Sequence, residues 1–72
     1  MDILKHPTPK EVKDTRTSID LSQAQAGNLL HVSERHFSRW EHGTAKMPLA
    51  YWELFMVKVR VLKAKRDARP MA

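Results

Sequence analysis

The hydrophobic and polar positions of this chain follow a helical period from about residue 9 onward, and no segment shows the alternating pattern of a β-strand. A capping box in Thr8-Pro9-Lys10-Glu11 opens a first helix, which we expect to end near Thr17–Ser18. Ser22, with Gln25 three residues later, opens a second helix over Gln23–Leu30. Small residues at positions 24, 26 and 27 would let another helix pack closely against this segment.

A short turn, His31-Val32-Ser33, separates the second helix from a third, which is expected from Glu34 to Glu41 or His42. Ser33 is the predicted N-cap, and Val32 forms a hydrophobic staple with Phe37. Gly43 is predicted to close the helix. Two short helices with this spacing are typical of a helix-turn-helix.

The last predicted helix begins at Met47-Pro48 and runs to about Lys65. Its apolar residues cover more than one stripe, so we expect the helix to be covered on two sides. One side would face the domain core and the other a second copy of the chain, with interface residues Tyr51, Phe55, Val59 and Leu62. The predicted fold class is therefore all-α, a compact domain of four to five helices that contains a helix-turn-helix and a long C-terminal helix.

We expect one domain, residues 9–65, between an N-terminal arm (1–8) and a basic tail (66–72). The net charge is +5, and acidic and basic side chains balance up to residue 57. The excess lies in a C-terminal cluster of Lys58, Arg60, Lys63, Lys65, Arg66 and Arg69. Two interpretations of this cluster stay open, phosphate contacts beside a DNA-reading module or an ordinary solvated helix face.

Several classes of protein are disfavoured by what the chain lacks. It has no cysteine, no apolar run near the roughly 18 residues of a membrane span and no secretory signal pattern, so we expect a soluble cytoplasmic protein. It has no nucleophile elbow, phosphate-binding glycine loop or converging acid pair, so we expect no enzyme, cofactor or small-molecule substrate. The spacing of His31, His36 and His42 does not place them on one helical face, so no metal site is predicted.

A helical wheel of the third helix separates a buried side from an outward side. Phe37 and Trp40 set the buried direction, and Arg35 and Arg39 fall at about 160° and 200° from Phe37. The outward face and its flanks hold Arg35, Arg39, His42, Ser38 and His36. Parallel guanidinium groups on an exposed short helix suit guanine N7 and O6 in the major groove. Two solvated arginines on an ordinary surface helix are the alternative interpretation.

The segment Ser22–Pro48 resembles the helix-turn-helix of the Cro/phage-repressor type, the Xre family. The resemblance rests on Gln23-Ala24, on core positions 26, 30, 32 and 37, on the sequence S-R-W-E-H-G at 38–43, and on Lys46 and Pro48. Two positions depart from the family pattern, because His31 replaces the usual turn glycine and Gly27 the usual alanine.

The resemblance implies a role for each matching position. Base edges would be read by Ser33, Glu34, Arg35, His36 and Arg39, to which the wheel adds Ser38 on the flank. Phosphates would be contacted by Gln23, His42, Thr44 and Lys46. Arg16 and Glu41 would form a structural salt bridge, in agreement with the inward direction of Glu41 on the wheel.

Together these features predict a sequence-specific DNA-binding transcriptional regulator. We expect a homodimer that binds an inverted-repeat operator in double-stranded DNA and represses its own phage or mobile-element operon. Anti-CRISPR-associated regulators and the antitoxins of toxin–antitoxin pairs are small proteins of this kind, and we favour the former. The alternative class is a protein-interaction module that has kept the helix-turn-helix scaffold.

Overall fold

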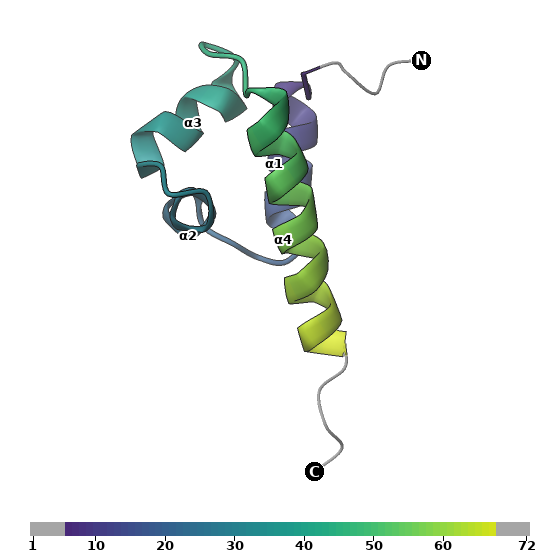
Figure 1. Cartoon of the computed structure of the whole chain (residues 1–72). Coiled ribbons are helices and arrows are strands. Elements are labelled where there is room, and N and C mark those ends of the chain that lie inside the picture. Colours follow the sequence, from purple (N-terminus) through teal and green to yellow (C-terminus); the bar gives the residue numbers. More distant parts are fainter. Residues whose placement is uncertain (1–5, 68–72) are drawn as a thin grey trace.

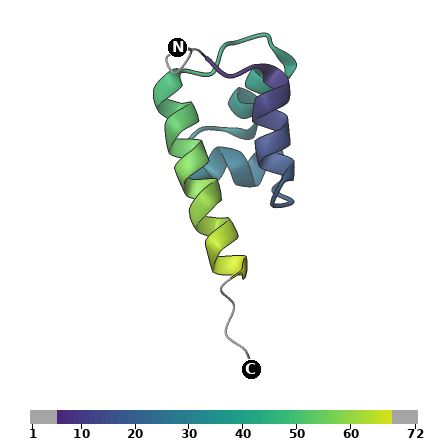
Figure 2. The ribbon, with the colours of Figure 1, turned by 90° about the vertical axis from the view of Figure 1, so that its right-hand side faces the viewer.

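Within residues 6–67, the part of the chain that this computed structural model describes, four helices follow one another. They are α1 (Pro9–Thr17), α2 (Gln23–Leu29), α3 (Glu34–His42) and α4 (Leu49–Asp67). Figure 1 shows α4 upright in front of α1 with α2 and α3 to one side, and Figure 2 shows that α4 extends past the other helices. The predicted all-α fold with a long last helix is confirmed.

Parts of the predicted arm and tail lie outside the described residues, namely positions 1–5 and 68–72, which include Arg69. In the range that the structure describes, none of the helices has both the length and the apolar character needed to cross a membrane.

Side chains cap the first three helices at the positions that the sequence predicts. The hydroxyl groups of Thr8 and Ser22 each accept a hydrogen bond from the backbone N–H three residues further on, at 3.1 Å and 3.0 Å. In both cases the side chain at that third position accepts a bond from the N–H of the cap residue. Ser33 caps α3, and Gly43 ends it in the left-handed conformation, with φ at 79°. The starts of α1, α2 and α3 and the end of α3 are therefore determined by local sequence.

All four helices contribute to one hydrophobic core. Its buried residues are Val12, Ile19, Ala26, Leu30, Phe37, Trp40, Met47, Phe55 and Val59. The ring of Phe37 is fully buried and packs edge-on against Trp40, with ring centroids 5.7 Å apart, and against Phe55, at 5.4 Å. Because two large side chains anchor α3 in the core from one side, its opposite side faces solvent.

Two of the four predicted interface residues belong to this core. Phe55 is 0% exposed and Val59 is 4% exposed, so neither can meet a second copy, and the prediction is wrong for both. Tyr51 and Leu62 are half-buried and pack against the edge of the core. A wheel of α4 shows several apolar directions, and only contact with the other helices selects the one that is buried. The large apolar side chains that remain exposed on α4 are Leu54, Met56, Val57 and Val61.

The turn between α2 and α3 depends on a close backbone approach at Gly27. The N–H of Val32 donates to the Gly27 carbonyl oxygen at 2.9 Å. A Cβ atom at position 27 would lie 2.8 Å from the Val32 carbonyl oxygen and 3.1 Å from that of Ser33. His31 occupies the left-handed region, with φ at 61°, at the position where the family pattern has glycine. Glycine is therefore needed at position 27 for space, while position 31 tolerates a side chain.

Gly27→Ala is expected to lower the free energy of unfolding by about 1–3 kcal/mol, because the added methyl group would displace the backbone of the turn. Thermal or urea unfolding followed by circular dichroism measures the change. Asn28→Ala, at the next and exposed position of α2, is the matched control and is expected to leave stability equal or slightly higher. Equal stability of the two variants would contradict the close approach.

Candidate nucleic-acid interface

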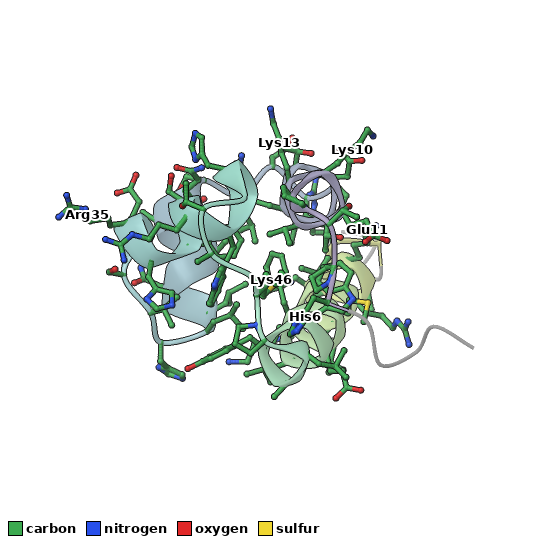
Figure 3. All side chains as sticks on the ribbon, turned by 90° about the horizontal axis from the view of Figure 1, so that it is seen from above. His6, Lys10, Glu11, Lys13, Arg35 and Lys46 are labelled. Atoms are coloured by element: carbon green, nitrogen blue, oxygen red, sulfur yellow. The ribbon has the colours of Figure 1, made fainter. Side chains whose placement is uncertain are left out.

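One face of α3 presents two arginines to solvent. Arg35 and Arg39 are both exposed and lie four residues apart on the helix, on the side away from the buried Phe37 and Trp40. Figure 3 shows Arg35 projecting beyond the ribbon at one margin of the molecule, far from the lysines on α1. The structure therefore brings two guanidinium groups to one outward face of a short helix.

A charged network holds α3 against α1 and α2. The guanidinium group of Arg16 donates two hydrogen bonds to the Glu41 carboxylate, from Nε to Oε2 at 2.5 Å and from Nη2 to Oε1 at 3.1 Å. Nε2 of Gln23 donates to the same carboxylate at 3.0 Å, and Nη1 of Arg16 donates to the Leu21 carbonyl oxygen at 2.7 Å. The ion pair that the sequence implies is present, and its two hydrogen bonds restrict the orientation of α3 relative to α1.

Three predicted contact residues make defined contacts within the protein. The Ser33 hydroxyl accepts the His36 N–H at 3.0 Å, and the His36 ring packs edge-on against Trp40, with centroids 4.8 Å apart. Gln23 at the start of α2 is half-buried and bonded to Glu41. These three side chains therefore help to position the helices at whose starts they lie.

The C-terminal end of α3 has a polar border. Nδ1 of His42 lies 2.8 Å from the Ser38 carbonyl oxygen and 3.1 Å from its hydroxyl group. The N–H and the hydroxyl group of Thr44 donate to the Arg39 carbonyl oxygen at 3.1 Å and 3.3 Å. Lys46 is exposed in the loop that leads to α4. The structure thus places the predicted phosphate contacts His42, Thr44 and Lys46 directly after the arginine face.

Lys58 and His6 make polar contacts that the sequence did not predict. Nζ of Lys58 donates to the Leu29 carbonyl oxygen at the end of α2, at 2.5 Å, although the sequence assigns Lys58 to the basic cluster. Nδ1 of His6 lies 2.8 Å from the Met47 carbonyl oxygen. The last turn of α2 has no basic residue of its own, so a cation from elsewhere is favoured there. Which basic side chain occupies this position is decided only by tertiary packing.

Similarity to one known protein extends over most of the chain. The chain is 33% identical over 52 residues to the type II methyltransferase M.MspI of a Moraxella species. The match covers 72% of this chain but only 12% of the methyltransferase, so the chain corresponds to a small part of that protein's length. No family model matches the chain.

This similarity corrects one expectation. The lack of catalytic motifs predicts that the chain is not an enzyme, whereas the protein that it resembles is a methyltransferase. The prediction is wrong because it weighed only motifs contained in 72 residues, and the similar protein is far longer than that.

Glu41→Ala is expected to lower the free energy of unfolding by about 3–5 kcal/mol, because it leaves the largely buried guanidinium group of Arg16 without its carboxylate. The double variant Arg16→Met with Glu41→Leu removes both charges and is expected to recover most of the loss. Urea unfolding at low temperature measures both. A double variant no more stable than the single one would show that an unpaired charge is not the cause.

Proposed function

We propose that this chain is a sequence-specific DNA-binding unit of the Cro/phage-repressor (Xre) helix-turn-helix type, with α3 as its recognition helix. The observation that carries the proposal is the way α3 is held. Phe37 and Trp40 fix its inner side, the Glu41 network fixes its orientation, and Arg35 and Arg39 extend from the outer side. A helix already fixed in this way can enter a major groove with little loss of conformational entropy.

Arg35 and Arg39 are the proposed readers of guanine. The planar guanidinium group donates two parallel hydrogen bonds to N7 and O6, a pattern that guanine alone offers in the major groove. Glu34, exposed in the first turn of α3, can accept a hydrogen bond from the amino group of cytosine. The remaining base contacts would come from the neighbouring Ser33, His36 and Ser38.

Phosphate contacts would flank this face and fix its register on the duplex. Gln23 at the start of α2 is bonded to Glu41 near the C-terminal end of α3, and His42, Thr44 and Lys46 follow at that same end. Such contacts orient the protein but carry no direct sequence information. Specificity would therefore come from α3, and the salt-dependent part of the affinity would come from the phosphate contacts around it.

The proposed biological role is transcriptional repression. Two copies would occupy an inverted-repeat operator, with half-site centres about 10 bp apart, and exclude RNA polymerase from an overlapping promoter. The all-helical fold is compatible with this role, and the similarity to M.MspI lends faint support to DNA binding itself.

A second candidate function is favoured by that same similarity. The chain would supply DNA contacts to methyltransferase chemistry rather than block transcription. A reporter gene that carries the bound sequence in its promoter separates the two functions. Repression by the chain alone supports the regulator, whereas tight binding without repression favours the second candidate.

Arg35→Ala and Arg39→Ala are each expected to weaken binding to the preferred duplex by about 1–3 kcal/mol, because each removes one bidentate base contact. Fluorescence anisotropy on a duplex selected from a random pool measures the affinity. Lys13→Ala is the matched control, since it removes the same charge from the exposed surface of α1, away from Arg35 (Figure 3). Affinities equal to that of the control would overturn the assignment of base readers.

Lys46→Ala is expected to weaken binding to preferred and random duplexes alike, because it removes a phosphate contact and no base contact. The slope of log K against log salt concentration should fall in magnitude by about 0.9. Titrations at several salt concentrations measure this slope. An unchanged slope would exclude Lys46 from the interface.

A further inference from the structure

An apolar stripe runs along the outside of α4. Its members are Ala50, Leu54, Val57, Val61 and Ala64, and all five are exposed. At 100° per residue they lie on the side of the helix opposite the buried Phe55 and Val59. Leu54, Val57 and Val61 are 39%, 56% and 47% exposed, although aliphatic residues of this size are usually buried. We call this surface the outer stripe.

The spacing of the outer stripe is that of a coiled-coil seam. Its steps along the sequence alternate between four and three residues, which is the a/d pattern of a heptad repeat. In this pattern Glu53 and Arg60 take g positions, and Lys58 and Lys65 take e positions. A partner for such a stripe is a second helix with the same repeat.

We infer that the outer stripe pairs with the outer stripe of a second copy of this chain, with the two α4 helices antiparallel. The inference rests on the proposed function, because an inverted-repeat operator needs a protein with twofold symmetry, and this helix pair supplies that symmetry. The core-facing side of each α4 stays covered by its own α1–α3, so the two domains lie on the outside of the helix pair.

Charge complementarity selects the antiparallel arrangement. When Leu54 faces Val57 of the partner, the g positions bring Glu53 beside Arg60 of the partner, and symmetry repeats this ion pair. A parallel pair would instead bring Arg60 beside Lys65 of the partner, which is repulsive. It would also require Lys58, the parallel partner of Glu53, to leave the Leu29 carbonyl oxygen to which it donates.

The direction in which Arg35 points from α3 leads to the same arrangement. Figure 1 shows α4 upright. Figure 3, which is seen from above along α4, shows Arg35 pointing sideways from α3 and away from α4. A parallel pair has its twofold axis along α4, so the two copies of Arg35 would point in opposite directions. An antiparallel pair has its twofold axis across α4, and both recognition helices can then face one DNA duplex.

Substitution of a seam residue tests the surface. Val57→Asp is expected to weaken self-association at least tenfold in sedimentation equilibrium without DNA, because it places two carboxylates in the apolar seam. Met56→Asp is the matched control, since Met56 is 36% exposed on the same helix but lies off the outer stripe. A wild-type chain that stays monomeric at millimolar concentration, or equal effects of the two variants, would overturn the inference.

Charge reversal tests the orientation. Arg60→Glu is expected to weaken the dimer about tenfold at low salt, because it turns both Glu53 contacts into repulsions. Adding Glu53→Arg to it should restore the wild-type dimer. In a parallel pair Arg60→Glu would strengthen association, since the new carboxylate would lie beside Lys65. That result would overturn the antiparallel arrangement.

Failure of this inference can be told apart from failure of the proposed function. Arg35→Ala should leave self-association unchanged, because Arg35 lies on α3, away from the outer stripe. A chain that dimerises as described but binds no DNA would overturn the proposed function alone. A chain that binds a single half-site but never dimerises would overturn the dimer alone.

Discussion

The ion pair between Arg16 and Glu41 is the interaction on which the arrangement of this domain depends. The Glu41 carboxylate, with its side chain 4% exposed, accepts hydrogen bonds from Arg16 of α1 and from Gln23 of α2. One group on α3 thus connects it to both helices that precede it. A buried ion pair adds little net stability compared with a well-packed apolar pair, because desolvation offsets most of the attraction. Its bonds are directional, however, and they favour one orientation of α3.

The aromatic core and the ion pair restrict α3 in different ways. Phe37 packs between Trp40 and Phe55, which fixes how deeply and on which side α3 is buried. Apolar packing alone leaves small rotations inexpensive, whereas the two hydrogen bonds from Arg16 oppose them. The result is a short helix with a fixed inner side, so the backbone positions from which Arg35 and Arg39 extend into solvent are fixed as well.

The long last helix, α4, has two different sides, one that completes the core and one that is apolar and exposed. Phe55 and Val59 complete the core from one side of α4, and Lys58 satisfies a carbonyl oxygen at the end of α2. The opposite side remains apolar and exposed, and it carries charges of opposite sign at matching heptad positions. The proposed recognition surface and the proposed dimer surface thus lie on separate helices, so one can be altered without the other.

The sequence by itself determined the helices, their caps and the outward direction of Arg35 and Arg39, because these depend on residues within one or two helical turns. It also indicated the partner of Glu41, through a resemblance to a family. Only the tertiary structure decided which apolar side of α4 is buried, and it moved Phe55 and Val59 from a predicted interface into the core. The same holds for Lys58, whose partner lies 29 residues away. A helical wheel shows which side chains share a direction, but the direction that is buried depends on the shape of the surface against which the helix packs.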